Sequence, residues 1–204
     1  MKLIPSLVAA AGAFFALPAL ADPVLLDFED QDSFASLHIP VSYGFTANGA
    51  LMALANDGGG TGLNGEYFSN NPSGNFVMFG FGPNPGERAE LATIGDRTFG
   101  GSVSFSYSSQ TGGTVFLRDF SGNVVDSILL EANSTSMDSP FSVWTLASLS
   151  ISAQNVHSID FSDALATTAF DNVQVNSVPL PAAVFLLPTG LAAFGVARRR
   201  RKTA

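Results

Sequence analysis

Cysteine is absent from this chain, histidine occurs only twice, and no lysine lies between residues 22 and 177. The absence of cysteine excludes disulfide bonds, iron–sulfur clusters, cysteine-ligated zinc and a thiol nucleophile. His38 and His157 leave little for general-base or metal chemistry, and no G-x-S-x-G nucleophile elbow is present. We therefore expect a protein that is not an enzyme.

Basic residues are also scarce in the middle of the chain. Residues 22–177 contain all 17 acidic residues but only three arginines, Arg88, Arg97 and Arg118, so this segment carries a formal charge of −14. A nucleic-acid backbone needs clustered lysine and arginine, which excludes nucleic acid as a partner. The same charge disfavours acidic polysaccharides unless divalent cations bridge the two.

The N-terminus has the three-part pattern of a secretory signal peptide. Lys2 precedes an apolar run over residues 7–17, and Ala19-Leu20-Ala21 forms an A-x-A cleavage site. The apolar run has no polar face, which argues against an amphipathic core helix. We therefore expect signal peptidase to cleave before Asp22, leaving residues 1–21 as the signal peptide, and the rest of the chain to be exported.

The C-terminus is also apolar but ends differently. Residues 178–197 carry no charge, and the basic cluster Arg198, Arg199, Arg200, Arg201 and Lys202 follows. A helix of that length reaches roughly 30 Å, the thickness of a bilayer's hydrocarbon core. The positive-inside rule puts the basic cluster in the cytoplasm and residues 22–177 outside. The sequence thus predicts a C-terminal transmembrane helix in the inner membrane, kinked at Pro188.

A short motif opens this C-terminal segment, residues Val178, Pro179, Leu180, Pro181 and Ala182. The motif, the apolar span and the terminal arginines occur in an order that resembles the PEP-CTERM class of sorting signals in its VPLPA variant. The resemblance covers residues 178–204. It implies a Gram-negative bacterium that makes exopolysaccharide, and an exosortase-type transpeptidase that cuts near the motif and passes the ectodomain to the cell surface.

The middle of the chain alternates apolar and polar residues with the period of a β-strand. In residues 101–108, Val103, Phe105 and Tyr107 alternate with small polar residues, which predicts an antiparallel sheet with one wet face. A hairpin turn is expected at Ser121-Gly122-Asn123. The expected strands are residues 24–29, 51–55, 75–81, 90–94, 101–108, 114–120, 124–130, 142–151, 156–161 and 169–175. They predict an all-β fold over residues 22–177, a two-sheet antiparallel sandwich of jelly-roll or Greek-key type.

Acidic residues stand near both ends of the expected sandwich. Asp27 and Glu29 point to the same face if they lie in a strand, and Asp171 lies in the last expected strand. Because first and last strands of sandwiches often lie together, these carboxylates are candidates for a structural calcium site. The alternative is that they are solvated acids, with Asp171 capping a turn. The segments Leu26-Asp27-Phe28-Glu29 and Phe170-Asp171-Asn172-Val173 resemble the ends of jelly-roll carbohydrate-binding domains, a resemblance that implies the same calcium.

Two further patterns bear on ligands. Gly59-Gly60-Thr61-Gly62-Leu63-Asn64 fits a calcium nonapeptide pattern with Asn in place of Asp, but a single copy favours a flexible loop. Aromatic residues with a flat face and a polar edge stack on sugar rings, and the candidates are Trp144, Tyr43, Tyr67 and Tyr107. Trp144, the only tryptophan, is the expected ligand platform, with a core position as the alternative.

Together these patterns predict an exported, surface-sorted β-sandwich protein without catalytic activity, a structural component of an extracellular matrix or biofilm. The alternative is a carbohydrate-binding module for exopolysaccharide. The expected partners are signal peptidase, an exosortase-type transpeptidase, the inner membrane and, for the alternative, exopolysaccharide. No cofactor is expected other than the structural calcium.

Overall fold

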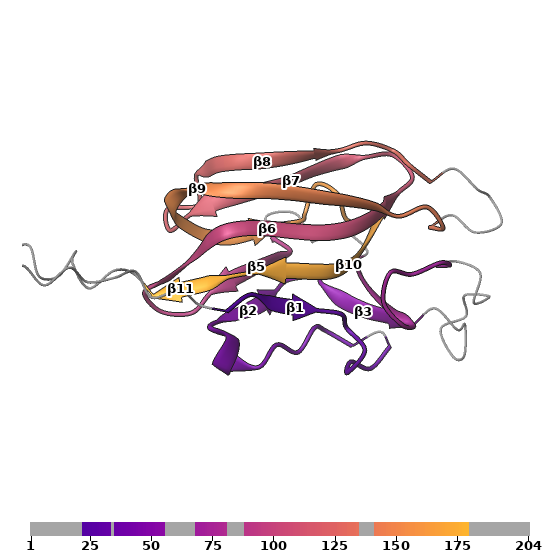
Figure 1. The fold of residues 1–204 in the computed structure, drawn as a ribbon, viewed down its shortest axis with the longest axis horizontal. Coiled ribbons are helices and arrows are strands. Elements are labelled where there is room, and N and C mark those ends of the chain that lie inside the picture. The colour runs from indigo at the N-terminus through magenta and orange to yellow at the C-terminus, as the bar shows by residue number, and fades with distance from the viewer. Residues whose placement is uncertain (1–21, 34, 56–67, 81–87, 135–140, 180–204) are drawn as a thin grey trace, which may run out of the picture. The chain divides into compact units, whose positions relative to one another are not determined.

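Eleven β-strands and one short 3-10 turn make up the part of the chain described by the structure, a computed structural model (Figure 1). The described residues are 22–33, 35–55, 68–80, 88–134 and 141–179. They contain no α-helix, and nothing helical among them has the length and apolarity to cross a bilayer. The predicted signal peptide and the basic cluster lie outside these residues. Val178 and Pro179, expected to open the transmembrane helix over residues 178–197, instead lie in a strand, Ser177–Pro179, that pairs with residues 97–99. The rest of the predicted span lies outside the described residues. The expected all-β class is confirmed.

The observed strands follow the expected ones closely. Every expected strand overlaps an observed strand, although β1 ends at Leu26 and residues 142–151 and 156–161 contribute to one long strand, β9. Two observed strands, β2 and β11, were not expected. The elements are β1 (Val24–Leu26), η1 (Val41–Tyr43), β2 (Phe45–Asn48), β3 (Met52–Ala55), β4 (Phe76–Phe79), β5 (Glu90–Thr93), β6 (Arg97–Ser109), β7 (Gly113–Asp119), β8 (Val124–Leu130), β9 (Thr145–Asp160), β10 (Thr168–Val175) and β11 (Ser177–Pro179).

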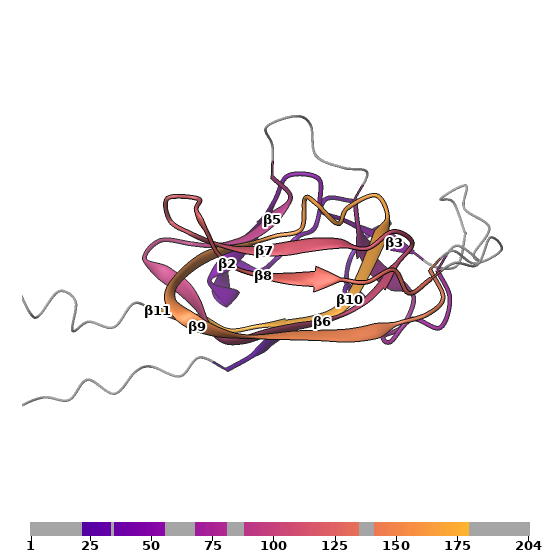
Figure 2. The ribbon, with the colours of Figure 1, turned by 90° about the horizontal axis from the view of Figure 1, so that it is seen from above.

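The strands form two layers that belong to one continuous antiparallel sheet. One layer runs β3, β4, β10, β6 and the first half of β9, with β1 beside β10. The other runs β2, β5, the second half of β9, β7 and β8. Figure 2 shows β9 curving from one layer to the other near β11. The two expected sheets are therefore one curled sheet, because the 16 residues of β9 serve both layers.

A glycine pair marks the point where β6 and β9 bend. Phe99 pairs with Val156, whereas Gly101 pairs with Ile151, so extra residues of β9 bulge out between these pairs. Gly101 has φ 72°, a left-handed conformation that costs a glycine little. Bulges bend a strand and increase its twist, which turns β9 toward the second layer.

The main core fills the space between the layers. Val103, Phe105 and Tyr107 of β6 point inward and are buried, as the alternation predicts. Phe105 packs edge-on against Phe161 and Phe170, with ring centroids 5.9 and 5.4 Å away. Fully burying a side chain of this size contributes roughly 1.5–3 kcal/mol. These contacts join the middle of β6 to Phe161, directly after β9, and to Phe170 of β10.

A smaller apolar cluster covers the outer face of β4. Met78 points into the main core, while Val77 and Phe79 on either side of it point to the opposite face. There Phe79 packs against Phe68 and Phe141, with ring centroids 5.7 and 5.4 Å away. Strand β4 is therefore buried on both faces.

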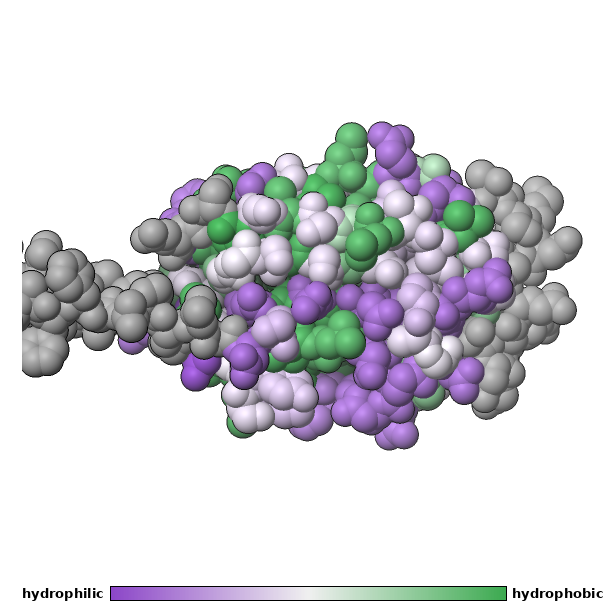
Figure 3. Space-filling model, in the orientation of Figure 1, coloured by the Kyte–Doolittle hydropathy of each residue, from purple (hydrophilic) through white to green (hydrophobic). Residues whose placement is uncertain are grey.

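The outer surface of the domain is mixed in character. Figure 3 shows one face, on which most hydrophobic side chains lie in the upper half, interspersed with hydrophilic ones. Among the large hydrophobic side chains that are exposed in the described residues, two are aromatic, Phe120 at 50% and Tyr43 at 39%. These two rings are the places to look for an aromatic ligand platform.

Candidate functional site

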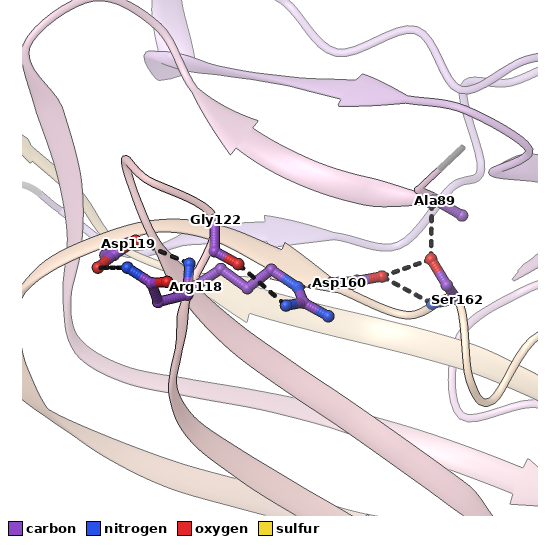
Figure 4. Close-up of polar contacts among 7 residues, drawn as sticks. Ala89, Arg118, Asp119, Gly122, Asp160 and Ser162 are labelled. Atoms are coloured by element: carbon purple, nitrogen blue, oxygen red, sulfur yellow. Dashed lines mark hydrogen bonds and ion pairs between the residues drawn. The ribbon is translucent and has the colours of Figure 1, made fainter. Parts of the chain in front are cut away.

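An ion pair lies on the outer face of the β7–β9–β5 layer (Figure 4). Arg118 of β7 points outward because its neighbour Leu117 points into the core, and its Nε donates to Oδ2 of Asp160 on β9 over 2.8 Å. The other carboxylate oxygen of Asp160 accepts from the backbone N–H of Ser162, at 3.0 Å, and from its hydroxyl, at 2.5 Å. The guanidinium is 5.3 Å from the centre of the Phe116 ring. Arg118 is thus held in one orientation.

The turn after β7 is tied together by Asp119. Its carboxylate accepts from the backbone N–H groups of Ser121 and Asn123, at 2.8 and 2.9 Å, and from the Asn123 side chain at 3.0 Å. The hydrogen bond from the Asn123 side chain is the main cause that lowers the pKa of Asp119. Nη1 of Arg118 also donates to the Gly122 carbonyl of this turn, at 3.1 Å. A fixed turn of this kind presents Phe120 at its tip.

Phe120 forms a stacked pair with His157 of β9. The ring centroids are 4.3 Å apart and the planes differ by 24°. The imidazole is held from behind, because its Nδ1 and the hydroxyl of Thr93 share a hydrogen bond of 2.7 Å. One side of the Phe120 ring is therefore supported while half of its surface is exposed.

A second arginine reaches the same turn. The guanidinium of Arg88 lies over Gly122, where a Cβ would be 3.0 Å from its Nη1. Within the described part of the chain Arg88 makes no hydrogen bond or ion pair, and it is exposed. Two of the three arginines of residues 22–177 thus meet at Gly122 in a strongly acidic domain. We call Arg88, Phe116, Arg118, Phe120 and His157 the arginine–aromatic face.

The predicted calcium residues are only partly brought together. The expectation that Asp27 and Glu29 share a strand face is wrong, because β1 ends at Leu26. Phe28 adopts φ 64° and its side chain is buried in the core, so the backbone departs from a strand conformation between Asp27 and Glu29. Asp27 is exposed and its carboxylate accepts only a long bond from the Glu29 N–H, at 3.4 Å.

Glu29 and Asp171 do approach each other, across the loop before β4. Asp171 is fully buried and accepts from the N–H and hydroxyl of Ser73, at 2.8 and 2.5 Å, and from the N–H of Asn172, at 2.6 Å. Glu29 accepts from the N–H of Phe76 at 2.8 Å and packs on Gly74. Burial raises the pKa of Asp171, and the nearby charge of Glu29 raises it further. The hydrogen bonds from Ser73 and Asn172 lower the pKa, but burial outweighs them. Within the described residues no three His, Asp or Glu side chains are grouped to hold a metal ion.

A small groove lies between β1 and the 3-10 turn. Its lining includes Asp27, His38 and Tyr43, and its volume is about 70 Å³. A pocket that encloses a small molecule has a volume of roughly 300–1,000 Å³, so the groove is far smaller than such a site. Tyr43 stacks on Phe45 with centroids 6.2 Å apart. The groove can receive an edge of a ligand but cannot enclose one.

The expected aromatic platforms occupy different environments. Trp144 packs on the outer cluster beside β4, and its indole N–H donates to the Ser69 carbonyl at 2.9 Å, so it is partly buried and fixed. Tyr107 is 5% exposed, which excludes it as a surface platform. Tyr67 and the glycine-rich stretch Gly59–Asn64 lie outside the described residues.

Comparison with known proteins gives structural similarities of low score. No family model and no curated protein matches the chain. A family 29 carbohydrate-binding module complexed with cellulohexaose has a TM-score of 0.42 and 14% identity, over 79% of this chain and 94% of that one. The CBM22-1 xylan-binding domain of Xyn10C from Paenibacillus barcinonensis has a TM-score of 0.38 and 14% identity, over 78% of this chain and 97% of that one. These values are too low to transfer a ligand or a site.

The sequence analysis did not identify Phe120 or the arginine pair. Phe120 ended an expected strand, and nothing in the alternation marked it as exposed. One feature of the sequence does indicate that Phe120 is exposed. It directly precedes the turn residues Ser121-Gly122-Asn123, and a residue in a surface turn is rarely buried.

Proposed function

We propose that residues 22–179 bind saccharide without catalysis, and that the ligand lies on the arginine–aromatic face. The observation that carries this proposal is the half-exposed Phe120 ring, stacked on His157, in the turn where two arginines meet at Gly122. Of the two functions expected from the sequence, this surface favours the carbohydrate-binding alternative over a purely structural role.

The chemistry of the face suits a sugar. The apolar side of a pyranose ring packs on an aromatic face, and Phe120 offers a flat surface that is supported from behind. Guanidinium groups donate several hydrogen bonds in a fixed plane and bind hydroxyl or carboxylate oxygens. Arg118 is already oriented by Asp160, so little side-chain entropy is lost when it binds. Arg88, which has no partner among the described residues, favours a sugar that carries a carboxylate.

The test uses a fragment of residues 22–179, which contains the described core and sheet. Binding to neutral glucans, xylan and uronate-containing polysaccharides is measured by affinity gel electrophoresis and calorimetry. We expect Phe120→Ala to weaken binding at least tenfold, whereas Leu129→Ala, a control at a 71% exposed residue of β8, leaves it unchanged. Arg88→Gln is expected to weaken binding of uronate-containing glycans more than of neutral ones. Absence of binding to every glycan contradicts the proposal.

Trp144, which packs on the outer cluster beside β4, is the alternative proposed contact, on the outer face of the other layer. It is the only tryptophan, so its fluorescence reports on a single environment. A saccharide on Trp144 shifts the emission, and Trp144→Phe then weakens binding. A saccharide on Phe120 alone leaves the emission unchanged.

We further propose that the chain is exported and sorted through its two terminal segments. In this proposal signal peptidase cuts after Ala21, residues 180–197 span the inner membrane, and an exosortase-type enzyme recognises residues 178–182 and passes the domain to the surface. Expression with and without residues 178–182 tests it, since mature mass and localisation are expected to differ. Identical mass and localisation contradict it.

A further inference from the structure

We propose that the end of the domain where β11 finishes rests on the lipid bilayer, with Val41, Tyr43 and Ile94 at the lipid interface. This inference rests on the membrane span proposed above for the residues after Pro179. It adds an orientation of the domain that neither the sorting signal nor the saccharide site requires.

Hydrogen bonds and strand pairing place these residues beside the end of β11. Pro179, the last residue of β11, pairs with Arg97, whose side chain lies against Gly44. The Gly44 carbonyl accepts from the Ile94 N–H at 2.9 Å and from the Ser177 hydroxyl at 3.2 Å. Gly44 directly follows the 3-10 turn Val41–Tyr43. The turn, Ile94 and the exit of the chain therefore form one patch.

The apolar side chains of this patch face solvent. Val41 is 79% exposed, the highest fraction among the exposed large hydrophobic side chains, and Ile94 and Tyr43 are 40% and 39% exposed. Each lies in a short turn rather than in a strand that could bury it. Tyrosine is enriched at membrane interfaces because its ring is apolar and its hydroxyl is polar.

Both connections of the domain leave at this end. Val24, the first residue of β1, pairs with Val175, which lies two residues before β11. In Figure 1, β1 begins and β11 ends at the same end of the described domain. The predicted apolar run continues from Pro179 without a polar linker, so the patch stays within a few residues of the span. A short tether raises the local concentration of the patch at the membrane.

The negative charge of the domain determines which lipid headgroups it can approach. Exposed Asp22 and Asp96 lie near the same end, and residues 22–177 carry −14. An anionic surface repels such a domain, so the contact is expected to be closest on zwitterionic phosphatidylcholine and weaker on phosphatidylglycerol at low salt.

Because the chain has no cysteine, single cysteines can be labelled without a background. The full chain with Val41→Cys or Ile94→Cys, labelled with an environment-sensitive fluorophore, is reconstituted into phosphatidylcholine vesicles. Gln110→Cys is the matched control, because it is exposed in the turn at the opposite end of β6. We expect blue-shifted, several-fold stronger emission and quenching by lipid-borne quenchers at positions 41 and 94 but not at 110.

Carbonate extraction of the same vesicles separates the two proposals. A chain that resists extraction but shows equal emission at all three positions has a span and no docked patch, which overturns this inference alone. A chain that is extracted overturns both the span and the inference. In the chain labelled at Val41→Cys, Ile94→Asp is expected to abolish the fluorescence difference between positions 41 and 110 while saccharide binding by Phe120 persists.

Discussion

The guanidinium of Arg118 and the carboxylate of Asp160 are joined by an Nε–Oδ2 hydrogen bond of 2.8 Å, and the Asp160 side chain is only 2% exposed. The two residues lie on neighbouring strands 42 positions apart in the chain. Removing one member of a buried pair leaves an uncompensated charge in a place that water does not reach. This pair therefore carries more weight in stability than a surface ion pair does.

We predict that Arg118→Leu lowers the free energy of unfolding by about 3 kcal/mol, the lower end for a broken buried pair, because Ser162 still binds Asp160. Arg118→Lys keeps the charge and should cost less. Urea denaturation of residues 22–179 measures both. If the free energies of unfolding of the Leu variant and the parent differ by less than about 0.5 kcal/mol, Arg118 is not needed to stabilise the charge of Asp160.

The pH dependence of stability should contain a component from Asp171. Burial raises the pKa of this carboxyl above its ordinary value of 3.8. The folded state therefore binds the proton more tightly than the unfolded state does. The resulting stabilisation is fully present below the pKa that Asp171 has in the unfolded state, and it is lost as the pH rises through its pKa in the folded state. Relative to Asp171→Asn, the parent should therefore lose stability as pH rises from about 3.8 upward.

Glu29→Gln provides an independent check of the same component, since its charge is one of the causes that raise the pKa of Asp171. Glu29 is exposed, so the variant should fold. The loss of stability with rising pH is expected to shrink in this variant. Denaturation curves at several pH values that superimpose for parent and variant contradict the coupling.

Calcium is predicted to stabilise the fold through the same two carboxylates. A bound cation relieves the repulsion between Glu29 and Asp171, and a ligand that binds only the folded state raises the melting temperature by mass action. Chelation should lower the melting temperature of the parent and leave Glu29→Gln unchanged, with magnesium as the control ion. An unchanged melting temperature of the parent on chelation rules out the calcium site.

The aromatic contact between the layers should dominate core stability. Phe105 is fully buried between Phe161 and Phe170, so Phe105→Ala is expected to cost about 3–5 kcal/mol. Phe120→Ala, at a half-exposed ring, should cost less than about 1 kcal/mol. Similar losses for the two variants in urea denaturation contradict this assignment of core and surface.

Two left-handed glycines offer a matched comparison. Gly49 has φ 75° and its missing Cβ points at the backbone carbonyl of Arg88, whereas Gly95 has φ 64° and faces open space. Gly95→Ala should cost only the conformational strain, about 1 kcal/mol. Gly49→Ala should cost clearly more, because the backbone of Arg88 has to move. Equal melting temperatures of the two variants contradict this difference.

Alternation in the sequence was enough to predict most strands, since a strand with one buried face repeats every two residues. It missed β2 because Phe45-Thr46-Ala47-Asn48 has a single large apolar residue. It missed β11 because Val178 and Pro179 were assigned to the sorting motif and to the apolar span that begins there. The break in alternation at Ser152-Ala153-Gln154-Asn155 led to the prediction of two strands, whereas these residues lie at a register shift within the single strand β9.

The sequence by itself determined the all-β class, the acidic charge of residues 22–177, the inward side of β6 and the neighbourhood of Glu29 and Asp171. Only the tertiary structure decided that β9 joins both layers, that Asp27 and Glu29 do not share a strand face, and that Arg88 and Arg118 meet at Gly122. The physical reason is that local periodicity follows from the pleat of one strand. Register and pairing depend instead on how side chains distant in the chain pack together.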